Sequence, residues 1–180
     1  MTQRSSGKSQ TDANSKDFWR TWEGAIKDAE TLLGMRMVLD ACATDASVAV
    51  AGEFISPDKD ALVVDWTPFG AFGAVWCNPP FSLKAEFLAR AHDQAVKNKL
   101  TVCCMIPFEV ATGWWSELVN NKATFVFMPD GRYPFIHPVT NELMRQPDFA
   151  TCFVVYTPHK VPTQYIPFER SKPPSLRKKQ

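Results

Sequence analysis

The residues best suited to chemistry form one tetrapeptide, Asn78-Pro79-Pro80-Phe81, which directly follows an apolar run at 74–77. Asn78 and Pro79 each precede a proline, which favours extended backbone, and the two prolines remove two backbone N–H donors. We therefore expect a stiff turn rich in hydrogen-bond acceptors, namely the Asn78 side-chain oxygen and the Pro79 carbonyl. Ligands of α/β sheets bind beyond the carboxyl ends of strands, so this turn is a candidate site.

Two acceptors on a stiff turn suit a planar NH2 group whose lone pair is delocalised into a ring or an amide. Holding both hydrogens favours a more pyramidal nitrogen and frees its lone pair for attack on a methyl sulfonium. Phe81 could stack on a base that carries this NH2 group, a contact worth about 1–3 kcal/mol. A base in a duplex must first leave the stack. This chemistry requires neither a metal nor a covalent intermediate.

The segments around the turn alternate between strand and helix patterns, and Gly34 marks the end of the first helix. Residues 44–60 are loop-like with room for one short helix, and 61–65 is a short apolar run that ends in Asp65. This alternation predicts an α/β fold with a mostly parallel sheet and helices on both faces. We expect helices at 22–33, 83–97 and 113–121, and strands at 35–43, 74–77, 100–106, 123–128 and 149–157.

The composition is that of a globular protein of 180 residues with a net charge of +1. No apolar run approaches the roughly 20 residues of a membrane span, and the polar N-terminus lacks the apolar core of a signal peptide. We therefore expect a cytoplasmic protein. The five cysteines and three histidines show no zinc-ligand spacing, so we expect reduced thiols and no metal site.

The two ends of the chain differ in character from its middle. Residues 1–16 are polar and expected to be disordered, and 17–160 to form a single domain. We expect 161–180 to be a disordered basic tail, since 169–180 holds five basic residues and one acid. Such a tail could contact phosphates or simply raise solubility. The sequence contains no G-x-G-x-x-G segment or P-loop, which argues against an ordinary dinucleotide or nucleoside triphosphate site.

Residues 76–82 resemble the catalytic motif [DNS]-P-P-[YF] of amino-methyltransferases. More narrowly, the chain resembles the phage-type DNA N6-adenine methyltransferases, the phage Dam-like family. Thr21 is followed by Trp22 where that family has proline, and Phe108-Glu109 replace the expected small and basic residues. The matching segments, in the order of the family, are 17–21, 39–43, 60–62, 65–66, 76–82, 114–115, 131–132 and Phe135.

This resemblance implies a Rossmann-like S-adenosylmethionine-dependent methyltransferase fold, with S-adenosylmethionine as the cofactor. It implies that Thr21, Asp40, Ala41 and Asp65 contact the cofactor, while the tetrapeptide carries the catalytic residues. A carboxylate at a strand end can accept hydrogen bonds from ribose hydroxyls, an ammonium or an amine. The alternative for each Asp is that it caps a following helix.

The resemblance also implies double-stranded DNA as the partner, acted on by a monomer or weak dimer, in the host cytoplasm if the protein is encoded by a phage. The irregular segment 130–148 is the candidate DNA-recognition loop, and Arg132 is its best candidate because Arg suits base edges. Ser82 and Lys84 are further candidate DNA contacts, with Lys84 suited to a phosphate. Each of these residues could instead be an ordinary surface residue.

Two other functions stay open at this point. The same tetrapeptide serves methylation of cytosine N4, of RNA adenine and of protein glutamine, all of which present a planar NH2. A non-catalytic DNA-binding module that kept the fold is the second alternative, although the intact Asn78 and both prolines argue against it.

Overall fold

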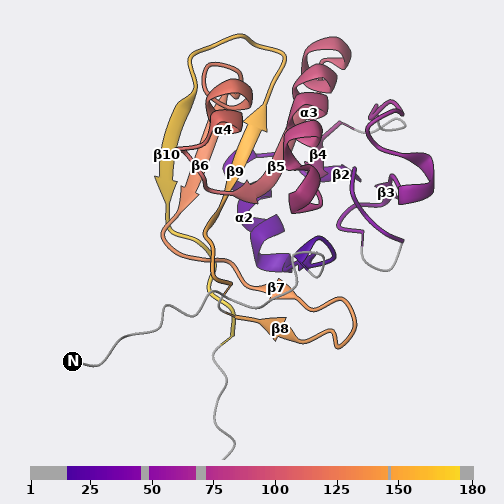
Figure 1. Cartoon of the computed structure of the whole chain (residues 1–180), viewed down its shortest axis with the longest axis vertical. Coiled ribbons are helices and arrows are strands. Elements are labelled where there is room, and N and C mark those ends of the chain that lie inside the picture. Colours follow the sequence, from indigo (N-terminus) through magenta and orange to yellow (C-terminus); the bar gives the residue numbers. More distant parts are fainter. Residues whose placement is uncertain (1–15, 46–48, 68–71, 146, 175–180) are drawn as a thin grey trace, which may run out of the picture.

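The computed structural model describes residues 16–45, 49–67, 72–145 and 147–174, and its main sheet has the strand order β10-β6-β9-β5-β4-β2-β3 (Figure 1). Strand β9 runs antiparallel to β5 and β6, and the other neighbours pair in parallel, which confirms a mostly parallel sheet. Except for Lys16, the expectation of disorder at 1–16 lies outside the described residues. The strands are β2 (Met37–Asp40), β3 (Glu53–Phe54), β4 (Ala74–Cys77), β5 (Thr101–Pro107), β6 (Phe125–Pro129), β9 (Thr151–Tyr156) and β10 (Gln164–Phe168).

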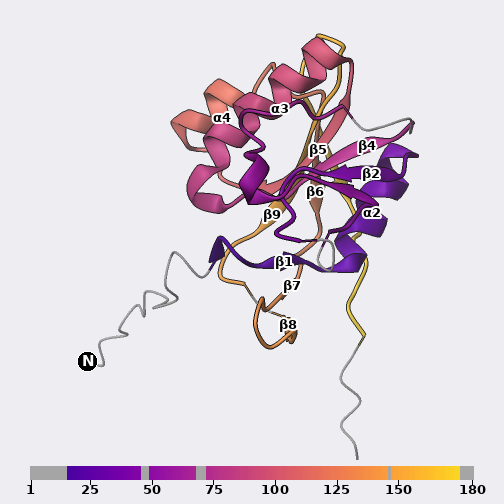
Figure 2. The same cartoon turned by 90° about the vertical axis from the view of Figure 1, so that its right-hand side faces the viewer.

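Helices cover both faces of this sheet. The helices are α2 (Glu23–Leu33), α3 (Lys84–Asn98) and α4 (Gly113–Leu118), with 3-10 turns η1 (Pro57–Lys59) and η2 (Phe81–Leu83). Figure 2 shows α3 and α4 on one side and α2 on the other. Two buried apolar clusters match this division, one that joins Leu88 and Trp115 to the sheet and one that joins Ala25 to Trp76. The result is a mixed α/β architecture compatible with a methyltransferase fold.

The sequence pattern located the elements next to the tetrapeptide well. The expected strand at 74–77 coincides with β4, and the expected helix at 83–97 is α3 to within one residue at each end. Helix α2 ends at Gly34, whose φ of 63° lies in the left-handed region that glycine adopts without strain. The apolar run at 61–65 forms a turn rather than regular structure. Among the described residues, no helix is long and apolar enough to cross a membrane.

The prediction that 161–180 is a disordered tail is wrong for its first part. Residues 164–168 form β10, which pairs in parallel with β6 at the edge of the sheet and is gold in Figure 1. Ile166 and Phe168 pack against the apolar cluster on the α2 side. Pro167 is tolerated because an edge strand does not need every N–H for a ladder. The basic composition of the following residues hid this short strand from the pattern.

The segment 130–148, predicted to be irregular, contains a β-hairpin. Its strands β7 (Phe135–Ile136) and β8 (Leu143–Met144) pair antiparallel, and β1 (Arg20–Thr21) adds a third strand beside β7. In Figure 1 the arrows of β10 and β6 point towards this hairpin, which therefore lies beyond the carboxyl ends of the parallel strands. Strands of two residues are too short to show alternation in the sequence.

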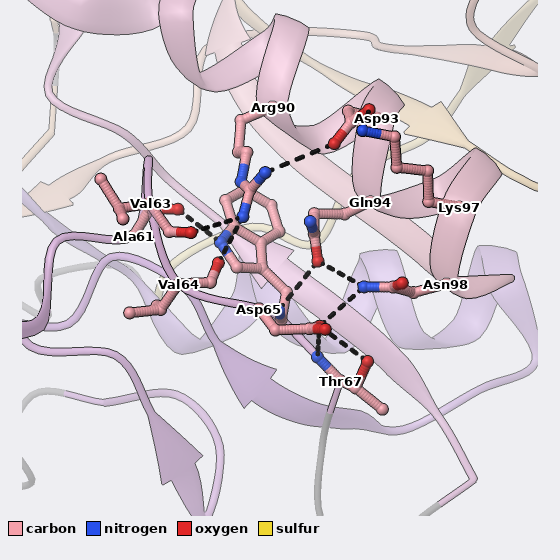
Figure 3. Close-up of polar contacts among 11 residues, drawn as sticks. Ala61, Val63, Val64, Asp65, Thr67, Arg90, Asp93, Gln94, Lys97 and Asn98 are labelled. Atoms are coloured by element: carbon pink, nitrogen blue, oxygen red, sulfur yellow. Dashed lines mark hydrogen bonds and ion pairs between the residues drawn. The ribbon is translucent and has the colours of Figure 1, made fainter.

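Helix α3 holds the loop that precedes β4. The Trp66 amide donates to Gln94 Oε1 at 2.8 Å, and the Trp66 indole N–H donates to the Ala61 carbonyl at 2.7 Å. Arg90 donates to the Val64 carbonyl at 2.6 Å (Figure 3). Trp66 and Gln94 are both buried, so these bonds satisfy polar groups that water cannot reach.

We expect Gln94→Leu to lower the free energy of unfolding by about 1–3 kcal/mol, because it leaves the buried Trp66 amide without an acceptor. Urea denaturation followed by circular dichroism measures the change. Lys97→Ala is the matched control on the exposed face of α3, where the ion pair with Asp93 contributes less than about 1 kcal/mol. Equal effects of the two substitutions would contradict this account.

Candidate active site

The carboxyl ends of β2 and β4 lie side by side, with β2 one strand in from the edge strand β3. The chain passes from β2 to β3 on one side and then returns to β4 on the other, so the strand order reverses between β2 and β4. Ligands of open α/β sheets bind at such a switch point. Asp40 ends β2 opposite Trp76, and Asn78 follows β4 directly. The fold therefore places these two polar side chains at one crevice.

Two adjoining cavities occupy this crevice. The first cavity, of about 250 Å³, lies between the two strand ends and the N-terminal segment 17–21. The second cavity, of about 210 Å³, shares the lining residues Cys42, Pro57 and Pro80 with the first. It extends to Asp60 and to Phe87, which lies on α3. Together they fall within the roughly 300–1,000 Å³ of small-molecule sites. The first cavity is lined by residues 17–21, Asp40, Cys42, Ala43, Thr44, Val50, Pro57, Trp76, Asn78 and Pro80.

The amide of Asn78 is held from one side only. Its Nδ2 donates to Thr21 Oγ1 at 3.1 Å and to the Trp19 carbonyl at 3.4 Å. Its Oδ1 is buried and has no hydrogen-bond partner among the described residues. Buried polar atoms in proteins almost always have a partner, so this oxygen is an acceptor available to a ligand. The side chain that the sequence singled out thus carries an acceptor that is unpaired among the described residues.

The carboxylate of Asp40 organises the loop after β2. Oδ1 accepts from the Cys42 amide and Oδ2 from the Val50 amide, each at 3.0 Å. Burial raises the pKa of Asp40 from 3.8 to about 6, although the two amide hydrogen bonds act in the opposite direction. At neutral pH the group is therefore mostly a buried anion, and a cationic ligand group in the first cavity would stabilise it.

Two buried donors beside the first cavity also lack acceptors among the described residues, namely Trp76 Nε1 and Arg20 Nε. Sequence reasoning missed both, because only the burial of these atoms distinguishes them. Thr21 and Asp40 line the first cavity and Ala41 lines the second, so the structure brings these three candidate cofactor contacts to adjoining cavities.

Asp65 does not join this group. It is exposed near the far end of α3, where Oδ1 accepts from the Thr67 amide at 2.9 Å and from Asn98 Nδ2 at 2.6 Å (Figure 3). The hydrogen bonds from Thr67 hold the pKa of Asp65 below its ordinary value. Asp65 lines neither cavity, so we do not retain it as a cofactor contact. Asp60, in the matched segment 60–62, lines the second cavity instead.

The ring of Phe81 belongs to an aromatic cluster beside the cavities. It packs edge-on against Phe149, with centroids 5.2 Å apart, and against Phe135 at 6.1 Å. Trp19 contacts the same two rings. Edge-to-face pairs of this kind fix ring orientation. Phe81 is partly buried and lines neither cavity, so its neighbours hold it at the rim of the site.

The candidate DNA contacts next to the motif already have acidic partners. The Ser82 amide and hydroxyl donate to the Asp17 carboxylate at 3.0 and 2.6 Å. Lys84 lies 3.9 Å from the Glu109 carboxylate and over the ring of Trp114. Both candidate DNA contacts, including Lys84 with its expected phosphate, thus make contacts within the protein. The structure assigns Ser82 in particular to fastening the N-terminal segment to the motif.

Arg132 lies at the base of the hairpin rather than at its tip. It is exposed, and its guanidinium donates to the Pro147 carbonyl at 3.0 Å, which ties the two ends of 130–148 together. At the tip, His137 and Val139 line an open hollow of about 450 Å³ together with Phe18 and Arg20. The hollow and the first cavity share Phe18, Trp19, Arg20 and Thr44.

The cysteines beside the cavities are unsuited to nucleophilic chemistry. Cys42 lines both cavities, and its sulfur lies 3.5 Å from that of Cys77. Burial raises the pKa of both thiols above the ordinary value, so they stay protonated at neutral pH. Within the described ranges, no group of three or more His, Cys, Asp or Glu side chains is arranged to hold a metal ion.

Two phage proteins are similar to this chain. The DNA N-6-adenine-methyltransferase of Haemophilus phage HP1 (strain HP1c1) is 31% identical over 151 residues, which cover 84% of each chain. The DNA N-6-adenine-methyltransferase of Escherichia phage T1 is 29% identical over 113 residues, which cover 63% of this chain and 45% of that protein. No solved structure matches the chain.

The family model described as DNA N-6-adenine-methyltransferase (Dam) matches residues 8–180. The match includes the tetrapeptide, both cavities and the hairpin, and it confirms the resemblance seen in the motifs. The chain therefore belongs to the DNA N-6-adenine-methyltransferase (Dam) family.

Proposed function

We propose that this protein is an adenine-specific DNA methyltransferase that uses S-adenosylmethionine on a Rossmann-like fold. One observation carries the proposal, namely the buried Asn78 Oδ1, which has no hydrogen-bond partner in the described part of the chain and lies beside a cavity at the switch point of the sheet. Family membership supports DNA adenine as the substrate in preference to cytosine, RNA or protein glutamine.

Asn78 holds the reacting amine. Its Oδ1 accepts one hydrogen of the NH2 group, and the Pro79 carbonyl accepts the other. Both acceptors are fixed before the substrate binds, because the prolines restrict the backbone and Thr21 and Trp19 restrict the amide. Preorganised dipoles of this kind stabilise the developing positive charge on the nitrogen without a reorganisation cost.

The donors and acceptors of the first cavity fit the methionine part of the cofactor. The Asp40 carboxylate suits an ammonium group, and Trp76 Nε1 and Arg20 Nε suit a carboxylate. In the second cavity, the apolar Phe87 and the Asp60 carboxylate suit an adenine ring with its amine. When bound, S-adenosylmethionine would supply the activated methyl group.

The target base reaches Asn78 from the hollow beneath the hairpin tip. The hollow and the first cavity are both lined by residues 18–20, so the two spaces lie next to each other. Two exposed apolar side chains flank it, Phe18 at 59% and Val139 at 81% of full exposure. An apolar contact with an unstacked base recovers part of the few kcal/mol that extrusion costs. We propose that the hairpin in 130–148 contacts the DNA duplex. Phe81 then stacks on the extruded adenine.

Substitution of Asn78 by Ala tests the central claim. We expect the rate of methyl transfer to double-stranded DNA to fall by about a hundredfold or more, because a transition-state acceptor is lost. The assay uses radiolabelled S-adenosylmethionine, with N6-methyladenine identified after DNA digestion. RNA and a glutamine peptide, offered in parallel, should remain unlabelled.

The matched control is Asn98→Ala, the same change at the far end of α3, which should leave the rate unchanged. Circular dichroism establishes that both variants are folded. A near-normal rate for Asn78→Ala would refute the role assigned to its oxygen.

Phe81 tests the stacking contact separately. We expect Phe81→Ala to lower the transfer rate by about tenfold, since a stacked base contributes about 1–3 kcal/mol. Phe81→Tyr keeps the ring face and should retain most of the activity. The idea fails if the Ala variant matches the parent protein in single-turnover rate and DNA affinity.

The affinity for the cofactor should depend on pH through Asp40. A bound ammonium requires the ionised carboxylate, so binding must displace the proton that Asp40 takes up below its pKa of about 6. We expect the affinity to fall by roughly tenfold per pH unit below pH 6 and to be flat from pH 7 to 7.5.

Calorimetric titration with the unreactive product S-adenosylhomocysteine measures this profile. Because the folded-state pKa is raised, protonation of Asp40 favours the fold at low pH, and weaker binding cannot result from unfolding caused by this group. Asp40→Asn should bind weakly with no such slope, and a parallel slope in that variant would exclude Asp40 as its origin.

A further inference from the structure

The segment 17–21 is held by contacts on both sides of the first cavity, which it lines. At one end, the Asp17 carboxylate accepts two hydrogen bonds from Ser82, immediately after the tetrapeptide. At the other end, Thr21 pairs with Phe135 of the hairpin. The intervening Trp19 ring packs against Phe135 as well. The backbone of this segment is therefore held in place independently of its contacts with Asn78.

The contacts of this segment with Asn78 have a direction. The Trp19 carbonyl can only accept a hydrogen bond, so it requires the NH2 end of the amide on its side. A threonine hydroxyl can accept or donate. Here Thr21 Oγ1 accepts from the same Nδ2 at 3.1 Å, which is shorter than the 3.4 Å contact with the Trp19 carbonyl. Rotation of the amide by 180° would set Oδ1 of Asn78 against the Trp19 carbonyl and would aim two N–H donors at the substrate amine.

We propose that Thr21 is a positioning residue which, with the Trp19 carbonyl, fixes the amide of Asn78 so that only its oxygen is presented to the substrate. This inference rests on the proposed function. The site would then select a group that donates hydrogen bonds, such as NH2, and reject a base that presents a carbonyl at the same place, because two acceptors would meet without a proton between them.

This role differs from the cofactor contact that the family resemblance implied for Thr21. A cofactor contact predicts weaker binding of the cofactor when the hydroxyl is removed. A positioning role predicts slower methyl transfer with unchanged cofactor affinity, since only the hydrogen bond between Asn78 and the substrate amine is weakened. The two roles can therefore be distinguished by measuring the cofactor dissociation constant and the transfer rate separately.

Thr21→Val removes the hydroxyl at nearly constant volume, and Thr21→Ser keeps it. We expect the Val variant to lose about tenfold to a hundredfold in single-turnover transfer rate, as for a misoriented catalytic group, with unchanged affinity for S-adenosylhomocysteine. The Ser variant should recover most of the rate. Thr31→Val, on the exposed surface of α2, is the matched control and should behave as the parent.

A second measurement reads the amide directly and needs no activity. In 15N-labelled protein, the side-chain NH2 signal of Asn78, assigned by its loss in Asn78→Ala, should show slow hydrogen exchange in the parent and in Thr21→Ser. It should exchange faster in Thr21→Val.

Unchanged exchange and an unchanged rate in Thr21→Val would overturn the positioning role, as would a loss confined to cofactor affinity. If the parent protein transferred no methyl group to DNA, the proposed function would fail, whereas the exchange data would still decide whether Thr21 holds the amide.

Discussion

The site depends on one constraint: the buried side-chain oxygen of Asn78 has no hydrogen-bond partner among the residues that the structure describes. Leaving such an acceptor unpaired costs about 1–3 kcal/mol, and Asn78 Oδ1 is in that position. The fold tolerates it because the other end of the amide is held by Thr21 and Trp19. The stability lost in the free protein is recovered when a donor binds, which is how a preorganised site acts on its substrate.

The sheet determines where Asn78 lies, and the N-terminal segment 17–21 determines how its amide is oriented. Parallel strands bring Asp40 and Asn78 to one crevice, because the strand order reverses between β2 and β4. The crevice alone would leave the Asn78 amide free to rotate. Residues 17–21 close it from the opposite side and are tied to both the tetrapeptide and the hairpin. The segment that orients the amine-binding group thus also reaches the element proposed to contact DNA.

Several buried polar atoms of the first cavity lack partners among the described residues, whereas the polar groups next to the motif have partners within the protein. The buried donors Trp76 Nε1 and Arg20 Nε and the buried Asp40 carboxylate belong to the first cavity, where a zwitterionic ligand part would satisfy both signs. Outside it, the groups of Ser82 and Lys84 are matched by the carboxylates of Asp17 and Glu109. The donors near the motif are therefore already paired within the protein, and the hollow at the hairpin tip remains the open approach.

The sequence by itself determined the tetrapeptide, its place after β4 and the alternation of strands and helices, because proline geometry and hydrophobic periodicity are local properties. It could not distinguish Asp60 from Asp65, since the two residues flank the same apolar run at 61–64 and only packing against α3 turns Asp65 towards Asn98. It also missed β10 and the hairpin strands, whose two to five residues depend on a partner strand. The contact between Thr21 and Asn78 spans 57 residues and exists only in the folded chain, because it joins groups that no local pattern relates.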